Sequence, residues 1–320
     1  MNTLLELLQD GSFHSGSVLG TALGVSRSAV WKQLQIMESE LGVTIHRVRG
    51  RGYRLENPIS LLNAGQLVSS CADEGWELRL HERVDSTNAE ALRSLSGGTQ
   101  SPVVVLAESQ TAGRGRRGRD WVSPFAENLY YSLVFRLENG AAQLEGLSLV
   151  VGLAVLQSLR ELGVSSAGLK WPNDILVNGK KIAGILLELT GDPADVCHVV
   201  VGIGINANMR ATDEAIDQPW TSVALELGAL CDRTALVTVL NRRLGECLRL
   251  HREKGFSALR AEWEANHLWQ GCSAVLTSGA QCIEGRVLGI DNQGALRLET
   301  NDGERHYSGG ELSLRLRNDS

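Results

Sequence analysis

One segment of the sequence combines glycine and arginine in a way that suits anion binding. Residues 110–119 hold four arginines and three glycines, whereas the whole chain of 320 residues carries a formal net charge of -6. Arginine supplies permanent charge in a planar donor fork, and glycine lets the backbone approach a ligand closely. The segment predicts a loop that closes over a polyphosphate. The alternative for an isolated basic run is a solvated loop or a disordered RGG-like nucleic-acid segment.

The flanks of this segment favour a built site. Residues 103–107 upstream and residues 128–135 downstream are apolar runs typical of buried strands. A glycine–arginine loop between two core strands is held in place at both ends. We therefore interpret it as part of a site.

A β-hairpin is predicted further along the chain. The apolar runs at 170–177 and 180–188 are separated by Asn178-Gly179, the strongest short-range hairpin signal. Lys181 follows the turn, where its ammonium could reach the arginine loop, although alone it would be an ordinary surface lysine. Asp174 opens the first strand and could hold a metal ion or merely cap a turn.

Alternating glycines mark residues 202–206, which read Gly-Ile-Gly-Ile-Asn. A dinucleotide-binding fold is excluded because the third glycine of its fingerprint and the acidic residue at the proper distance are both missing. Such a strand instead predicts close approach by a ligand or another backbone. The polar stretch at 208–220 predicts a mobile loop.

Composition predicts a protein of two or three domains that stays in the cytoplasm. Hydrophobic residues make up 43% of the chain, and the mean hydropathy is -0.07. Six scattered cysteines without a CxxC pair indicate free thiols in a reducing compartment. The N-terminus lacks a basic leader, so no signal peptide is expected, and the apolar stretch at 147–156 is too short to span a membrane.

Residues 1–57 predict a winged helix-turn-helix DNA-binding domain. Asp10-Gly11 ends a first helix, Ser15 caps a second, and Ser26 caps a third that runs through Met37. Strands at 43–45 and 52–55 form the wing. A major-groove reader would use the outward face of the third helix and the wing, here Ser26, Arg27, Ser28, Trp31, Lys32, Gln33, Arg49 and Arg51. A winged helix used only for protein contacts is the alternative.

The rest of the chain completes an α+β fold. Residues 58–64 are predicted as a linker, and residues 65–268 as a central mixed α/β domain with helices at 86–95 and 143–162. Five short strands between Gly271 and Arg317 predict a small SH3-like β-barrel within residues 269–320.

Five motifs together resemble the biotin–protein ligases. Their order and spacing match that family over nearly all 320 residues, and the presence of the helix-turn-helix resembles the bacterial bifunctional form, which is both ligase and repressor of the biotin operon. The motifs are residues 85–88, 110–119, 170–174, 181–185 and 202–206.

The resemblance implies a two-step reaction with ATP, Mg²⁺ and biotin. It assigns electrostatic catalysis to Lys181 and Arg116. It also implies a biotin site formed by Ser86, Thr87, Asn88, Gln110, Gly113, Arg114, Gly115, Arg116, Trp121 and Lys181, and a nucleotide site formed by Arg116, Arg117, Arg119, Asn173, Asp174 and Asn206. Asp174 is the possible Mg²⁺ contact. Helix capping is the alternative role for Ser86 and Thr87, and a core position is the alternative for Trp121.

The resemblance also implies partners. They are the biotin carboxyl carrier protein, operator DNA of biotin biosynthesis genes, and a second copy of the chain once biotinyl-5′-AMP is bound; no membrane is involved. Two other functions remain open. A DNA-binding biotin sensor without ligation would not need Arg116 and Lys181. A ligase for a related acyl group such as lipoate would share the architecture, although the glycine–arginine tract favours biotin.

Overall fold

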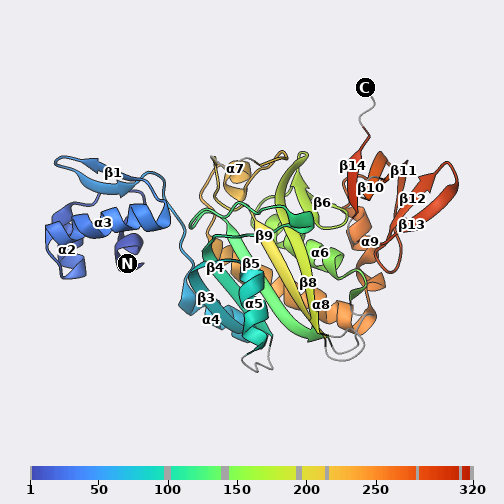
Figure 1. The fold of residues 1–320 in the computed structure, drawn as a ribbon, viewed down its shortest axis with the longest axis horizontal. Helices are drawn as coiled ribbons and strands as arrows, with labels where there is room; N and C mark the ends of the chain where they lie inside the picture. Colours follow the sequence, from blue (N-terminus) through green and yellow to red (C-terminus); the bar gives the residue numbers. More distant parts are fainter. Residues whose placement is uncertain are drawn as a thin grey trace.

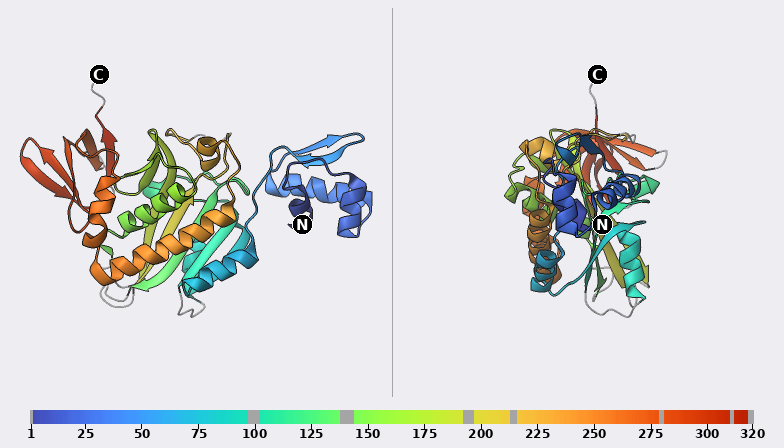
Figure 2. Two further views of the ribbon diagram at one scale, coloured as in Figure 1. Left: turned by 180° about the vertical axis from the view of Figure 1, so that it is seen from behind. Right: turned by 90° about the vertical axis from the view of Figure 1, so that its left-hand side faces the viewer.

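The computed structural model describes residues 2–96, 102–137, 144–191, 197–212, 216–278, 281–309 and 312–317. A helical module, a central sheet with helices on both faces and a small all-β unit follow one another along the chain (Figure 1). The helical module and the all-β unit lie at opposite ends of the central sheet (Figure 2). This is the predicted α+β class.

The N-terminal module has the predicted helix-turn-helix and wing. Ser15 and Ser26 cap their helices by accepting hydrogen bonds from the backbone amides of Val18 and Ala29. Two boundaries differ from the prediction: the third helix extends to Leu41, because that residue is buried on the same face as Met37, and the first wing strand begins at Ile45, because the chain must first turn at Gly42. The elements are α1 (Asn2–Leu8), α2 (Gly16–Leu23), α3 (Arg27–Leu41), β1 (Ile45–Val48) and β2 (Gly52–Leu55).

The core of this module is closed by residues from the central part. Phe125 and Ala126 are buried in the same cluster as the leucines of α1 and α3, and Ile59 and Leu61 pack against it. The segment between the N-terminal module and the central part, which the sequence predicted as a linker, therefore packs against this shared apolar cluster.

A buried arginine fixes the joining segment to the central part. Arg233, fully buried, donates to the carbonyl oxygen of Ser60 at 2.7 Å and pairs with the Glu108 carboxylate, which also accepts from the amide of Leu62 at 2.8 Å. Helix α4 then begins at Ala64, inside the predicted linker range.

The central sheet has seven strands in the order β3-β4-β5-β9-β8-β7-β6. Only β3 and β4 run parallel, and every other neighbouring pair is antiparallel. The predicted hairpin joins β7 to β8 through Asn178 and Gly179, both with positive φ. The strands are β3 (Glu77–Val84), β4 (Val103–Gln110), β5 (Leu129–Leu137), β6 (Ala167–Lys170), β7 (Asp174–Val177), β8 (Lys180–Gly191) and β9 (Cys197–Ile205).

Helices cover the two faces of this sheet unequally. The long helices α6 and α8 pack on one face, where the largest apolar core lies, and α5 packs on the other face over β4, β5 and β9. Helix α6 begins at Leu147, after Gly146 in the left-handed region, which is later than predicted; the predicted start at residue 143 lies outside the described residues. The helices are α4 (Ala64–Asp73), α5 (Thr87–Leu95), α6 (Leu147–Glu161), α7 (Val223–Leu227), α8 (Arg233–Lys254) and α9 (Ser257–Ala265).

The C-terminal unit is a five-stranded antiparallel sheet in the order β13-β12-β11-β10-β14. Its five strands agree with the predicted small SH3-like unit. The buried indole of Trp171 donates to the Gly294 carbonyl at 3.1 Å and ties the unit to the central part. The strands are β10 (Ser273–Ser278), β11 (Gln281–Ile290), β12 (Leu296–Thr300), β13 (Gly303–Tyr307) and β14 (Ser313–Leu316).

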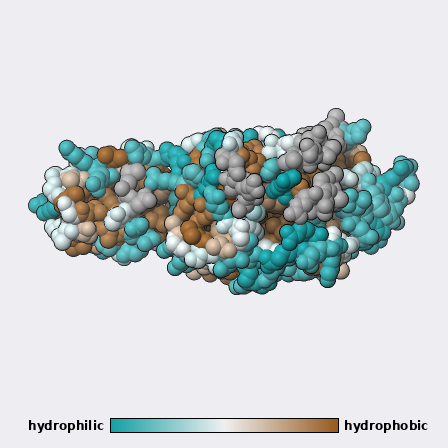
Figure 3. All heavy atoms as spheres, turned by 90° about the horizontal axis from the view of Figure 1, so that it is seen from below, coloured by the Kyte–Doolittle hydropathy of each residue, from teal (hydrophilic) through white to brown (hydrophobic). Residues whose placement is uncertain are grey.

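Apolar side chains reach the surface in separate patches on the face shown in Figure 3. Among the helices in the described ranges, none combines the length and the apolar character that a membrane crossing requires.

Candidate active site

Three glycines on neighbouring strands form the floor of the site. Gly184 of β8 lies directly opposite Gly204 of β9, and Gly202 lies opposite Ser132 of β5, all on the face of the sheet that α5 covers. Without side chains these positions leave a trough, and a narrow cavity of about 50 Å³ remains above it.

The trough is partly filled by side chains of the protein itself. A Cβ at Gly202 would collide with the Asn88 carboxamide, and a Cβ at Gly204 would collide with the Trp121 indole. The alternating glycines were predicted to admit a ligand or another backbone, and here they admit these two side chains. The remaining space is small because these two side chains occupy part of the trough.

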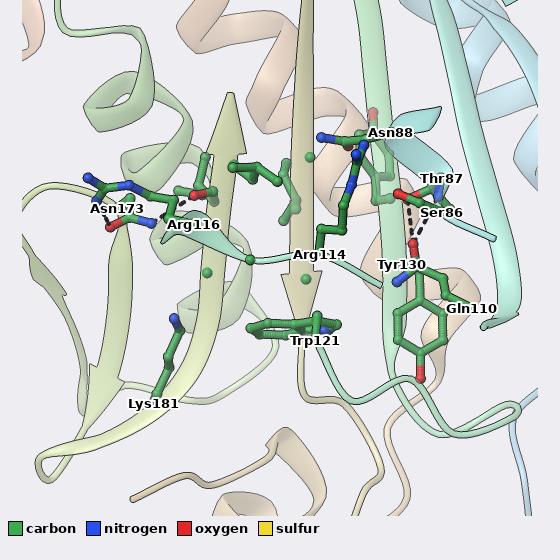
Figure 4. Close-up of a pocket in the computed structure, with 18 residues that line it drawn as sticks. Ser86, Thr87, Asn88, Gln110, Arg114, Arg116, Trp121, Tyr130, Asn173 and Lys181 are labelled. Atoms are coloured by element: carbon green, nitrogen blue, oxygen red, sulfur yellow. Dashed lines mark hydrogen bonds between the residues drawn. The ribbon is translucent and has the colours of Figure 1, made fainter. Parts of the chain in front are cut away.

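A polar cluster closes one end of the trough (Figure 4). The Gln110 side-chain oxygen accepts from the amide of Thr87 at 2.9 Å, and the Ser132 hydroxyl lies 2.8 Å from the Thr87 hydroxyl and 2.6 Å from the Asn88 side-chain oxygen. All but the half-buried Gln110 are buried. Ser86 occupies the N-cap position of α5 but makes no side-chain capping bond, so the capping alternative is wrong for it. Gln110, from β4, supplies the acceptor instead.

Ser132 was missed by the sequence analysis. It is the only residue in 129–135 that is neither aliphatic nor aromatic, and it points to the same face as Gly202. A lone serine in such an apolar run is the signal that could have identified it.

The glycine–arginine loop has a defined course beside the trough. Arg116 donates to the Asn173 side-chain oxygen at 2.7 Å and to the Leu312 carbonyl at 3.2 Å, so it joins the loop to the central and C-terminal parts. Arg114 lies against Glu188 of β8 at 3.2 Å. Arg117 has a left-handed backbone with φ 61°, and like Arg119 it is exposed. The alternative of a disordered RGG-like segment does not fit this placement.

Lys181 lies half-buried against a carboxylate, so the alternative of an ordinary surface lysine does not apply. Its ammonium lies 2.7 Å from Asp174 and 5.5 Å from the centre of the Trp121 ring, and its side chain is 15% exposed. Lys170 approaches the same carboxylate at 3.5 Å. Burial alone would raise the pKa of Asp174, but the two ammonium groups outweigh it and hold that pKa below its ordinary value. Burial also lowers the pKa of Lys170.

A larger cationic cavity of about 570 Å³ adjoins Lys181, between β7, β8 and the C-terminal unit. The arginines predicted at the nucleotide site contribute to it. Sequence analysis missed three of its lining residues, which come from distant segments: Lys170, Trp269 and Arg315. Such a concentration of positive charge in a concave site suits a polyphosphate.

Asn206 plays a structural role in the described contacts. Its amide donates to the carbonyl oxygens of Lys181 and Thr221 at 3.3 and 3.0 Å. It also lines a cavity of about 540 Å³ together with Trp121 and Trp220.

The ends of the loop predicted as mobile are held in place. Asn208 is buried and exchanges two hydrogen bonds with the backbone of Cys231, and the amide of Lys181 donates to the Pro219 carbonyl at 2.9 Å. The prediction of mobility is therefore wrong for these ends.

The residues predicted to read DNA lie on one surface of the N-terminal module. Arg27, Ser28, Trp31 and Lys32 are exposed on α3, and Gln33 is half-buried. The Ser26 side chain caps that helix. In the wing, Arg49 and Arg51 are exposed, and Arg51 stacks on Phe13 at 4.2 Å.

Comparison with known proteins identifies three matching family models. The HTH domain matches residues 1–54, the Biotin/lipoate A/B protein ligase family matches residues 80–206, and the Biotin protein ligase C terminal domain matches residues 274–315. The chain is 42% identical over 313 residues to the Bifunctional ligase/repressor BirA of Escherichia coli (strain K12), covering 98% of this chain and 96% of the relative.

The chain belongs to this family of bifunctional biotin protein ligases. A second member, the Bifunctional ligase/repressor BirA of Bacillus subtilis (strain 168), is 32% identical over 317 residues. The match covers 97% of each chain. The fold agrees as well. A biotin protein ligase from Aquifex aeolicus, solved in complex with biotin and ATP, superposes with a TM-score of 0.66 at 33% identity, covering 75% of this chain and 99% of that one.

The two cavities adjoin each other. The glycine-floored trough with its polar end and the cationic cavity meet at Lys181, which lines both.

Proposed function

We propose that this protein activates biotin with ATP and transfers it to a lysine of the biotin carboxyl carrier protein of acetyl-CoA carboxylase. The observation that carries the proposal is the position of Lys181, between a polar-ended trough and a cationic cavity. In the first step a biotin carboxylate oxygen attacks the α-phosphorus of ATP, and pyrophosphate leaves. In the second step the carrier lysine attacks the acyl carbon of biotinyl-5′-AMP, and AMP leaves.

Both steps develop negative charge on phosphate and carbonyl oxygens, so fixed cations are the main help that the protein can give. We assign that role to Lys181 and Arg116. Asp174 holds the Lys181 ammonium in place, and Asn173 does the same for the Arg116 guanidinium.

We propose that the ring of biotin binds at the polar end of the trough. The predicted residues Ser86, Thr87, Asn88, Gln110, Gly115 and Trp121 line this cavity, and Ser132 joins their hydrogen-bond network. Gly113 approaches the Trp121 carbonyl too closely for any side chain, so it fixes the path of the loop. Arg114 covers the trough, and closure matters because water would hydrolyse the acyl-adenylate.

The nucleotide is proposed to bind the cationic cavity through Arg116, Arg117 and Arg119, with Asn173 and Asp174 at its edge. Asn206 would shape the adjoining cavity through its backbone contacts.

A protein-held Mg²⁺ fits these residues poorly. The described residues contain no group of three acidic, histidine or cysteine side chains suited to a metal ion, and two lysines already neutralise Asp174. Mg²⁺ prefers substrate phosphates with one or two carboxylates. We propose that it enters on ATP, and we assign no step to it.

We also propose that the chain represses biotin biosynthesis genes as a dimer whose corepressor is biotinyl-5′-AMP. A single helix-turn-helix per chain reads one half-site, so two copies are needed for two half-sites. The proposed boundaries remain 1–57, 58–64, 65–268 and 269–320. Six free cysteines suit a cytoplasmic protein.

Incubation of an apo carrier domain with the protein, ATP and either biotin or lipoate tests the enzymatic proposal. We expect a mass increase of one biotinyl group with biotin alone. Labelling by lipoate alone would replace biotin as the substrate, and no labelling would favour a sensor without ligation.

Gel-shift and sedimentation measurements test the repressor proposal. Operator binding and dimerisation should both strengthen with biotinyl-5′-AMP, and deletion of residues 1–57 should abolish DNA binding but leave carrier labelling. We propose that dimer and carrier share one surface of the central part, so excess apo carrier domain should dissolve the dimer. A complex containing both would contradict the shared surface.

A further inference from the structure

Glu188 lies outside the predicted site and yet contacts two of its residues. Its carboxylate accepts from the Asn88 amide nitrogen at 2.7 Å and lies 3.2 Å from the Arg114 guanidinium. It is on β8, two positions beyond Leu186, so its side chain points to the same face of the sheet as Gly184 and the trough.

The carboxylate determines the orientation of the Asn88 carboxamide. An ionised carboxylate only accepts hydrogen bonds, so Asn88 must present its nitrogen to Glu188 and its oxygen to Ser132. That oxygen lies 2.6 Å from the Ser132 hydroxyl. The carboxamide also lies over Gly202, where a Cβ would collide with it.

The orientation of Asn88 in turn determines the polarity of Ser132. A hydroxyl has one proton, and donating it to Asn88 leaves Ser132 with acceptor lone pairs only. The Thr87 hydroxyl lies 2.8 Å from Ser132 and 3.1 Å from the Gln110 side-chain oxygen, so its single proton goes to one of these two acceptors. Thr87 lines the cavity, and its free lone pair offers an acceptor there, which suits a ligand with ring N–H groups.

We propose that Glu188 is a positioning residue for substrate recognition, which keeps the Ser132 proton on Asn88 and off Thr87, so that Thr87 can accept from an N–H group of a cyclic urea. This inference rests on the proposed function, because biotin supplies such a ring. The same carboxylate also holds Arg114 across the trough, but that contact is exposed and contributes less.

The test is Glu188→Gln, measured as biotin binding by calorimetry and as steady-state adenylation. The amide is nearly the same shape but can donate or accept, so Asn88 is free to flip. We expect the Kd and KM for biotin to rise about tenfold, the loss of one charge-assisted hydrogen bond, and kcat to stay within about twofold, because the reacting carboxylate lies at the other end of the ligand.

Two variants and a second ligand sharpen the test. Glu161→Gln neutralises a carboxylate that pairs with Arg242 and Arg243 on the far face, and it should bind biotin like the parent. Arg114→Met removes only the loop partner and should weaken biotin less than Glu188→Gln does. Lipoate lacks ring N–H groups. We therefore expect the inhibition constant of lipoate, measured in competition with biotin, to be the same in Glu188→Gln and in the parent.

Three results would overturn the inference: unchanged biotin affinity in Glu188→Gln, an equal loss in Glu161→Gln, or an equal loss in Arg114→Met. Failure of the parent to bind biotin would instead overturn the proposed function. Melting curves identify any variant that fails to fold. If Glu188→Gln fails, Asn88→Asp takes its place, because it puts a second acceptor against Glu188. It should weaken biotin binding at least as much. Unchanged affinity there would also overturn the inference.

Discussion

Single side chains in this protein owe their chemistry to the partners that surround them. Lys181 has an ordinary sequence context after a turn, yet it is buried between Asp174 and the Trp121 ring. Lys180, its neighbour, is exposed. Two adjacent lysines therefore provide a matched pair for separating catalysis from surface charge.

Lys181→Ala should reduce adenylation by about 100-fold, the scale of losing one preorganised group that stabilises transition-state charge. Lys180→Ala should behave like the parent. Pyrophosphate release measures both rates. Equal rates in the two variants would remove Lys181 from the site. Because Lys181→Ala leaves Asp174 with Lys170 alone, a lowered melting temperature is also expected, and single-turnover rates at 10 °C separate this effect from catalysis.

Glu127 should make stability depend on pH. Burial raises the pKa of its carboxyl to about 7, partly offset by Arg233. The folded state therefore holds this proton more tightly than the unfolded chain, so the stabilisation is present below pH 4.5 and is lost as the pH rises to about 7. Glu127→Gln should raise the free energy of unfolding at pH 8 by on the order of 1 kcal/mol, a figure reduced because the carboxyl is partly exposed. At pH 4.5 the same variant should change the free energy of unfolding very little. Urea denaturation at both pH values measures this, and an equal gain at both would refute it.

Secondary-structure elements bring these side chains together through short turns. The β7–β8 hairpin places Asp174 and Lys181 on adjacent strands, and its turn needs positive φ at Asn178 (50°) and Gly179 (77°). Helix α5 begins at the trough because Gln110 accepts from the amide of Thr87. The geometry of the site therefore depends on a turn and a helix end.

Gly179→Ala should lower the free energy of unfolding by about 1 kcal/mol, because alanine is strained in the left-handed region, while the surrounding space is open. Asn178→Gly should change it little, since glycine accepts the same backbone. Urea midpoints of the two variants measure the difference. Similar midpoints would show that the turn adapts without cost.

At the scale of the whole molecule, a polar junction fixes the segment that follows the N-terminal module to the central part. Arg233 at the start of α8 donates to the carbonyls of Ser60 and Asn128 and pairs with Glu108. The amide of Asn208 donates to the Glu127 carbonyl beside it. Ser60, in the segment that follows the N-terminal module, therefore meets residues 127–128 and the start of the polar stretch at 208–220 at this junction.

Arg233→Met should destabilise the protein by about 3–5 kcal/mol, because Glu108 would remain buried and unpaired. The double variant with Glu108→Gln should recover part of that loss. Arg242→Met, which breaks an exposed ion pair, is the control and should change little. Thermal melting of the parent, Arg233→Met, Glu108→Gln, the double variant and Arg242→Met decides it, and additive losses in the double variant would mean that the two side chains act independently.

The sequence by itself determined what depends on neighbours in the chain. The caps at Ser15 and Ser26, the Asn178-Gly179 hairpin and the five C-terminal strands were predicted, because each is set by a few consecutive residues. The order of the five motifs was sufficient to indicate the family.

Only the tertiary structure decided which side chains share an environment. Ser132, Glu188 and Arg315 belong to three strands from two parts of the fold, so no local pattern connects them. The capping role passed from Ser86 to Gln110, and Lys181, predicted at the site, proved to be paired with Asp174. The physical reason is that burial and hydrogen-bond partners arise from contacts between segments far apart in the sequence, such as β5 with β9 or Arg116 with Leu312, where local propensity carries no information.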